Sequence, residues 1–278
     1  MKISFRNLSF GYKSQGSRIR LLNNRNISPS GGLLFDNFNT EFNSIESGRP
    51  LVILGTSGCG KTTLLKLLGG LLKPDSGRII YTCESVPNTP VQIIIDGASE
   101  NKGPNTSFIF QEPRLPPWLT VLENVSLPLE KNLGREEARE RARRFLSLVS
   151  LEGMDGAHLG ELSGGQAQRV SMARAFAWPA PVLLMDEPFQ SLDIPLRIGL
   201  MDGILSLLEK EKRLLIAVTH DPREAVYLGG RIIILGKAGE GIVYDRVIDL
   251  DSAERAYGSA AAGKLEQEMI HVLGSTDA

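Results

Sequence analysis

A glycine-rich segment between an apolar run and a leucine-rich run constrains the fold of this chain more than any other feature. Residues 51–72 read LVILGTSGCGKTTLLKLLGGLL, and residues 55–62 satisfy the pattern G-x-x-x-x-G-K-[ST]. Glycines let a backbone wrap around a phosphate, so that N–H groups and the N-terminus of the next helix point inward. The pattern predicts a strand, a phosphate loop and a helix, with Lys61 at the β- and γ-phosphates and Thr62 at Mg²⁺.

Several other short apolar runs predict strands. The runs PLVILG, SFIFQ, PVLLMD, LLIAVTH and RIIILG alternate with longer helix-like stretches. That alternation indicates an α/β fold with a mostly parallel sheet covered by helices. The runs are apolar without alternation, as expected of strands buried on both faces. The chain has 278 residues, of which 42% are hydrophobic, enough to fill such a core.

The character of the sequence changes after Gln111. Ala138, Ala142, Phe145 and Val149 are spaced by four, three and four residues, which predicts one apolar helical face. We therefore expect residues 112–162 to form a helical lobe inserted into a core of residues 1–111 and 163–250. Residues 251–278 should form a terminal helix and tail. Residues 13–33 and 82–106 suggest long β-hairpins or mobile loops at a sheet edge.

Charge and cysteine content limit the classes of partner. The 31 basic and 32 acidic residues nearly cancel, so we expect no nucleic-acid partner. Cys59 and Cys83 have no metal-binding spacing and indicate reduced thiols; inside the phosphate loop, Cys59 is expected to fill space. The first residues lack a signal peptide's apolar stretch, and no run approaches the roughly 20 apolar residues that span a bilayer.

Polar residues end three of the predicted strands. In PVLLMDEPFQSLD, Asp186 is placed to hold Mg²⁺ through water, and Glu187 to polarise the water that attacks the γ-phosphate. His220 in VTHDPREA could donate to the γ-phosphate, although a helix cap or surface residue is the alternative. Gln111, which closes SFIFQ, and Tyr12 in LSFGYK are weak signals by themselves.

A second small-residue turn lies in ELSGGQAQRVSMARA, residues 161–175. Ser163, Gly164 and Gly165 precede a helix, so their N–H groups could bind a phosphate, but the turn has no lysine. An ordinary glycine-containing N-cap is the alternative.

Together these motifs resemble those of the ATP-binding cassette (ABC) ATPases. Tyr12, the phosphate loop, Gln111, LSGGQ, LLMDEP, SLD and His220 occur in that family's order and approximate spacing, over residues 3–250. LSGGQ is the specific mark, because most other phosphate-loop enzymes lack it. EPRLPPWLTVLENVSLPL and GTSGCGKTTLLKLLGGLLKPDSG further resemble cassettes of nitrate, sulfonate and taurine importers. The resemblance implies a phosphate-loop NTPase core with an antiparallel β subdomain on its N-terminal side.

The resemblance also implies a role for each motif residue. Tyr12 would stack on adenine, although the long 13–33 segment leaves Phe10 and Phe35 as alternatives. Gln111 would contact the metal and the lytic water. The phosphates and Mg²⁺ would be held by Gly55, Thr56, Ser57, Gly58, Cys59, Gly60, Lys61, Thr62 and Thr63.

The remaining motif residues would act on the metal, the water and the γ-phosphate, or at the contact with a second cassette. Asp186 would support the metal, Glu187 would be the catalytic base and His220 would clamp the γ-phosphate. Asp193 would line the contact with a second cassette. The turn formed by Ser163, Gly164, Gly165 and Gln166 would act on ATP held by that second cassette.

The leading hypothesis from the resemblance is an energy-coupling ATPase subunit of a bacterial importer. Its cofactors would be ATP and Mg²⁺, and its partners a second copy, permease subunits and indirectly a substrate-binding protein. It would lie peripherally at the cytoplasmic face of the plasma membrane. Trp118, with Leu115, Pro116 and Pro117, would line the permease dock or belong to the core. The alternatives are an exporter or lipid-extraction ATPase, or a soluble cassette in cofactor assembly; the solute stays open.

Overall fold

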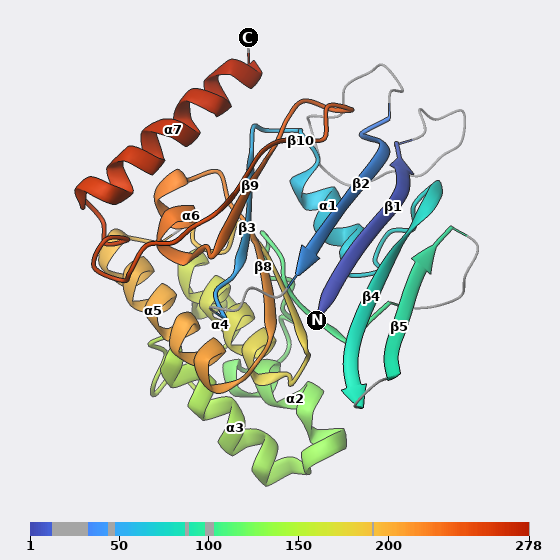
Figure 1. Cartoon of the computed structure of the whole chain (residues 1–278). Coiled ribbons are helices and arrows are strands. Elements are labelled where there is room, and N and C mark those ends of the chain that lie inside the picture. The colour runs from blue at the N-terminus through green and yellow to red at the C-terminus, as the bar shows by residue number, and fades with distance from the viewer. Residues whose placement is uncertain (13–32, 44–47, 87–88, 98–102, 191, 278) are drawn as a thin grey trace. The chain divides into compact units, whose positions relative to one another are not determined.

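The computed structural model describes residues 1–12, 33–43, 48–86, 89–97, 103–190 and 192–277 (Figure 1). These residues form two compact units. Unit 1 comprises residues 1–104 and 218–278, and unit 2 comprises residues 105–217. The proposed boundaries of core, helical lobe and tail stay a prediction. The predicted hairpin or loop at 13–33 lies almost entirely outside the described residues.

An antiparallel sheet forms one part of unit 1, with strands in the order β2-β1-β4-β5 (Figure 1). Its strands are β1 (Lys2–Phe10), β2 (Phe35–Asn43), β4 (Ser76–Val86) and β5 (Thr89–Asp96). One face is apolar: the Phe5 ring lies edge-on to Phe38 and Phe42, with centroids 5.4 and 5.2 Å away. β4 pairs with β5, so the hairpin predicted within 82–106 is confirmed where it is described, and β5 lies at the sheet edge.

Three further strands of unit 1 carry the phosphate loop. They are β3 (Leu51–Gly55), β9 (Arg231–Leu235) and β10 (Ile242–Val247), in the order β10-β9-β3. β3 runs parallel to β9, and β10 is antiparallel to β9. All five residues of β3 are buried, as its unbroken apolar run predicts. The helices of this unit are α1 (Lys61–Leu68), α6 (Pro222–Leu228) and α7 (Ala260–Asp277).

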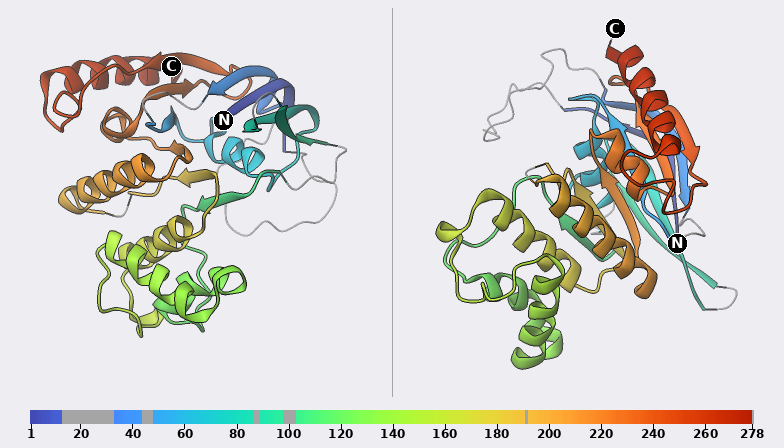
Figure 2. Two further views of the ribbon diagram at one scale, coloured as in Figure 1. Left: turned by 60° about the horizontal axis from the view of Figure 1, so that its bottom comes forward. Right: turned by 90° about the vertical axis from the view of Figure 1, so that its left-hand side faces the viewer.

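Unit 2 contains three strands and most of the helices. β6 (Thr106–Ile109) is parallel to β7 (Val182–Asp186), and β8 (Leu214–Val218) is the other neighbour of β7. The helices are α2 (Val121–Leu133), α3 (Arg135–Leu148), the 3₁₀ turn η1 (Leu159–Glu161), α4 (Gly164–Ala177) and α5 (Ile194–Lys210) (Figure 2). The predicted α/β class, with parallel strand pairs and an antiparallel N-terminal sheet, is confirmed.

The apolar stripe predicted for residues 138–149 is buried along its whole length. Ala138, Ala142 and Phe145 lie on α3, and Val149 ends the helix. α2 begins with a capping box, in which the Thr120 hydroxyl accepts from the Glu123 N–H and the Glu123 carboxylate accepts from the Thr120 N–H. α2 and α3 pack against each other and against α4. This packing holds the helix that follows the LSGGQ turn.

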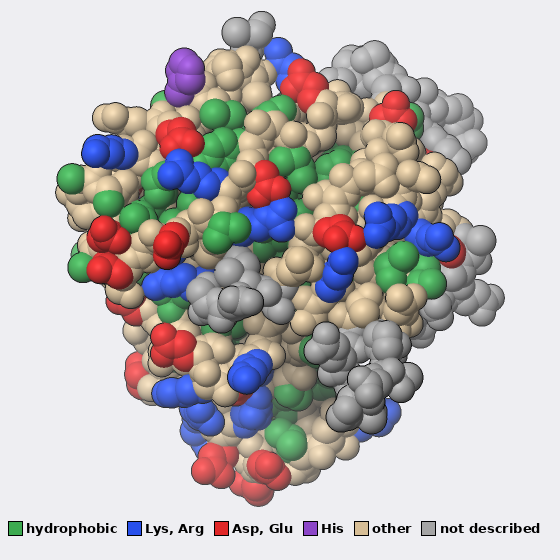
Figure 3. Space-filling model, in the orientation of Figure 1, with side chains coloured by type: hydrophobic (Ala, Val, Ile, Leu, Met, Phe, Trp, Pro, Cys, Tyr) green, Lys and Arg blue, Asp and Glu red, His purple; other side chains and the backbone are tan. Residues whose placement is uncertain are grey.

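Charges of both signs are interspersed on the face displayed in Figure 3, in keeping with the small net charge. Among the helices that the structure describes, none is long and apolar enough to cross a membrane.

A buried arginine holds the segment that precedes α7. Arg255 is 3% exposed, and its guanidinium donates to the carbonyls of Leu250, Val226, Gly229 and Ile248. Burial lowers its pKa to about 10, so the side chain is still a cation at neutral pH. Two of these carbonyls belong to the C-terminal end of α6, where a positive charge is favourable.

Replacing Arg255 by Met should destabilise unit 1, because buried carbonyls would lose their donor. We expect a loss of about 3 kcal/mol in the free energy of unfolding, measured by urea denaturation. Arg246→Met is the control, since Arg246 pairs with Glu268 at the surface and its loss should cost under about 1 kcal/mol. Equal stability of Arg255→Met and the wild type would contradict this assignment.

Candidate nucleotide-binding site

The phosphate loop joins β3 to α1 in unit 1. Gly60, the N-cap of α1, has φ +108°, and a Cβ there would lie 3.0 Å from atoms of Leu34 and Phe35. No side chain caps the N-terminus of α1, and its first turn contains no acidic residue. The first N–H groups of a helix have no partner within the helix, and the helix dipole favours an anion at this end. The loop is therefore suited to bind phosphate.

Lys61 contacts its own loop. Its Nζ donates to the carbonyls of Gly55 at 2.8 Å and Thr56 at 2.9 Å, and the side chain is buried. An ammonium group has three donors, and here two of them are occupied by neutral carbonyls. An incoming phosphate would offer a stronger, charge-assisted bond to the same group.

Cys59 is a packing residue of this loop. It is buried, and a Cβ on Gly55 would lie 2.5 Å from its Sγ, so the loop closes only with glycine at position 55. Burial raises the pKa of the Cys59 thiol, against the opposing charge of Lys61. A thiol with a raised pKa is unreactive, which favours the space-filling role.

Tyr12 lies close to the first turn of α1. Its hydroxyl is 3.1 Å from Oγ1 of Thr63, and its ring lies edge-on to Phe10. Phe10 and Phe35, the two alternatives for adenine stacking, are both buried, whereas Tyr12 is partly exposed. An exposed ring face is needed to stack on a base, so burial favours Tyr12.

The acidic pair and Gln111 lie in unit 2, at the carboxyl ends of two parallel strands. Asp186 is the buried last residue of β7, and Glu187 follows it with φ +46°. Gln111 follows β6, and its Nε2 donates to Oε1 of Gln190 at 3.2 Å. Because β6 and β7 are parallel and paired as far as Ile109 and Met185, these polar residues leave the same sheet edge.

The LSGGQ turn begins α4. Ser163 is the N-cap, and its hydroxyl accepts from the Gln166 N–H at 3.2 Å while the Gln166 side chain accepts from the Ser163 N–H at 2.8 Å. The turn is thus an N-cap, as the alternative interpretation expected. The cap does not exclude a phosphate, because the accepting hydroxyl keeps its own proton to donate, and the first turn of α4 contains no acid.

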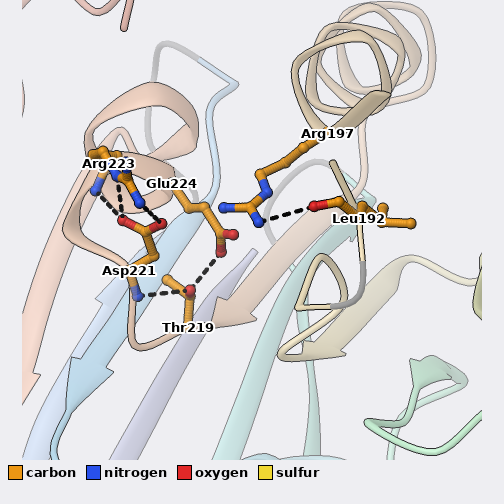
Figure 4. Close-up of polar contacts among 6 residues, drawn as sticks. All are labelled: Leu192, Arg197, Thr219, Asp221, Arg223 and Glu224. Carbon is orange, nitrogen blue, oxygen red and sulfur yellow. Dashed lines mark hydrogen bonds and ion pairs between the residues drawn. The ribbon is translucent and has the colours of Figure 1, made fainter. Parts of the chain in front are cut away.

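Asp193 begins α5. Its carboxylate accepts from the Leu196 N–H at 3.0 Å, and Arg197 donates to the carbonyl of Leu192 at 3.1 Å (Figure 4). These bonds order the described part of the SLD segment on the same unit as the LSGGQ turn. Burial lowers the pKa of Arg169 in α4, and the charge of Asp193 opposes that shift.

His220 lies in unit 1, between β8 and α6, and its side chain is exposed. Sequence reasoning missed three polar residues that lie close to motif residues: Gln190, Thr219 and Glu224. Gln190 lies in the segment that follows the acidic pair, but a lone amide gave no signal for its bond to Gln111.

Comparison with known proteins gives the family. The ABC transporter family model matches residues 39–190. A taurine import ATP-binding protein of Pseudomonas savastanoi pv. phaseolicola is 39% identical over 230 residues, which are 81% of this chain and 83% of that protein. An uncharacterised ABC transporter ATP-binding protein of Methanocaldococcus jannaschii is 37% identical over 238 residues, 84% of this chain and 78% of that protein.

The fold also matches a solved cassette. A dimeric ATP-binding cassette in a post-hydrolysis state, bound to ADP and Pi, superposes with a TM-score of 0.71 at 30% identity, covering 90% of this chain and all of that chain. Sequence, fold and motif order agree, and they confirm both the resemblance and the ATPase activity that it implied. The chain belongs to the ABC transporter family, whose ATP-binding cassettes hydrolyse ATP to power transport.

Proposed function

We propose that this chain is the energy-coupling subunit of an importer, and that two copies close on ATP to drive a permease. The observation that carries the proposal is the pair of helix N-termini suited to anions, one with Lys61 and one without a lysine. A turn without a lysine, in the same chain as a complete phosphate loop, suits a site shared by two chains.

The phosphate loop supplies the grip on ATP. Lys61 exchanges its carbonyl partners for the β- and γ-phosphates, and the N–H groups at the start of α1 bind the phosphate oxygens. Thr62 and Asp186 are oxygen donors of the kind that Mg²⁺ prefers, few in number because Mg²⁺ also binds substrate phosphates. When bound, Mg²⁺ neutralises negative charge on the phosphate oxygens. Tyr12 stacks on adenine.

Three residues then act on the lytic water and the γ-phosphate. Glu187 polarises the water and Gln111 orients it; Gln111 would also help to hold Mg²⁺. His220, which follows β8 and is exposed, donates to the γ-phosphate. Glu187 and Gln111 belong to unit 2, and His220 belongs to unit 1.

The second cassette completes each site. Ser163 donates its hydroxyl proton to the partner's γ-phosphate, and the N–H groups of Gly164 and Gly165 add the helix dipole of α4. Gln166 caps the turn, and Asp193 lines the contact between the two chains. The dimeric cassette bound to ADP and Pi, 30% identical to this chain, supports this arrangement.

Trp118 is our candidate for the permease dock. Its side chain is 75% exposed, which excludes the core role considered from the sequence, whereas Leu115 is buried. Exposed tryptophan is enriched at binding interfaces. The cassette is then held peripherally at the cytoplasmic face of the membrane by its permease, which a binding protein supplies with solute. The relative named as a taurine import ATP-binding protein favours taurine or a similar sulfonate as that solute.

Glu187→Gln should trap the closed dimer. The amide cannot take a proton from the lytic water, so ATP stays bound without being hydrolysed. Light scattering after size exclusion should detect dimers that form only with ATP, and turnover should fall at least about 100-fold. The wild-type protein is the control, because it hydrolyses its bound ATP and should not accumulate as a dimer. A monomeric variant with normal hydrolysis would refute both the base and the closure.

Ser163→Arg should separate binding from turnover. A bulky side chain at the turn blocks the partner's γ-phosphate but leaves the phosphate loop intact. We expect ATP affinity of the monomer to stay within about twofold, while turnover falls at least about 100-fold. Lys61→Ala is the matched control, which should lose ATP binding itself. Loss of monomer ATP binding in Ser163→Arg would mean that the turn serves its own chain.

A further inference from the structure

His220 projects from a backbone segment that is anchored on both sides. Its own side chain is exposed, yet Thr219 before it and Glu224 four residues after it are each 4% exposed. The Thr219 N–H donates to the carbonyl of Ile53 in β3 at 3.2 Å. The exposed His220 ring thus belongs to a turn whose neighbouring residues Thr219 and Glu224 are buried.

One hydroxyl connects the two sides of this turn. Thr219 donates through Oγ1 to the Glu224 carboxylate, and the same Oγ1 accepts from the Asp221 N–H at 3.1 Å (Figure 4). These two bonds enclose the His220 peptide, with the buried carboxylate at one end. Asp221 in turn caps α6, accepting from the Arg223 N–H at 2.9 Å and pairing with the Arg223 guanidinium.

A bond of this kind fixes the direction of the backbone. A hydrogen bond is stronger in the low local dielectric of a buried place than it is in water. The His220 ring is carried by this backbone, so a rotation of the segment would move the ring away from its target. Misplacement of a reacting or stabilising group by about 1 Å can cost a factor of the order of 100 in rate.

We propose that Glu224, acting through the Thr219 hydroxyl, is a positioning residue that aims His220 at the γ-phosphate. The proposal rests on the role given to His220 above. Glu224 is too enclosed to serve as a solvent-facing cap, and its carboxylate lies in α6, where it ties the first turn of that helix to the end of β8.

Paired variants test the proposal. Thr219→Val removes the hydroxyl with little change of shape, and Glu224→Leu removes the acceptor. Each should lower kcat roughly tenfold and leave the KM for ATP within about twofold, because the phosphate loop is untouched. Thr219→Ser and Glu224→Gln keep a donor and an acceptor, and should retain kcat within about twofold of the wild type.

The background variant His220→Ala makes the test specific. If Thr219 acts only through His220, adding Thr219→Val to His220→Ala causes no further loss of kcat. A structural role would instead give additive losses. Tyr81→Phe is the matched control: it removes another buried hydroxyl of unit 1, which donates to the Leu68 carbonyl, and should lower the melting temperature without changing kcat.

The outcomes separate the two hypotheses. Full turnover by His220→Ala would refute the role of His220 and this inference with it. Loss of turnover by His220→Ala, with normal kcat in Thr219→Val, would overturn the positioning role alone. Additive losses in the double variant would overturn it as well. Should Glu224→Leu fail to fold, Thr219→Val, the smaller change, decides.

Discussion

The N-terminus of α1 is the feature on which the account of this protein depends, because the first N–H groups and the dipole of a helix favour an anion there. A helix begins there with glycine at its N-cap, no capping side chain and no acid in its first turn. The buried strand β3 leads directly into the phosphate loop. Within the loop, Gly55 and Cys59 lie so close that a Cβ on Gly55 would clash with the Cys59 Sγ. A phosphate supplies the negative charge and the acceptor oxygens that a helix N-terminus favours.

Lys61 gives this site a defined resting state. Its ammonium group donates to two carbonyls of its own loop, so the buried charge is hydrogen-bonded. The charge lies in the loop that would bind a phosphate. The N-terminus of α4 differs, because Ser163 and Gln166 cap each other and no lysine is near in the sequence. One helix end can hold a nucleotide; the other can only add to one already held.

Local patterns gave the phosphate loop, the carboxylate at the end of β7 and the apolar face of α3, because each depends on neighbours within a few residues. Burial decided what spacing left open: it favoured Tyr12 over Phe10 and Phe35, and it excluded Trp118 from the core. Gln111 and Gln190, 79 residues apart, could not be paired from sequence, because the strand pairing of β6 and β7 sets their distance. The same holds for Arg255, whose carbonyl partners belong to two separate segments, the end of α6 and residues 248–250.

The central claim is that each site is completed by the other chain, and a mixing experiment tests it most directly. Lys61→Ala keeps an intact LSGGQ turn, and Ser163→Arg keeps an intact phosphate loop, so each variant alone should be inactive. Mixed in equal amounts, they should recover up to about a quarter of the wild-type ATPase rate, because random pairing makes half the dimers mixed and each of these holds one complete site of two. A mixture as inactive as its components, in which mixed dimers are shown to form, would contradict the account.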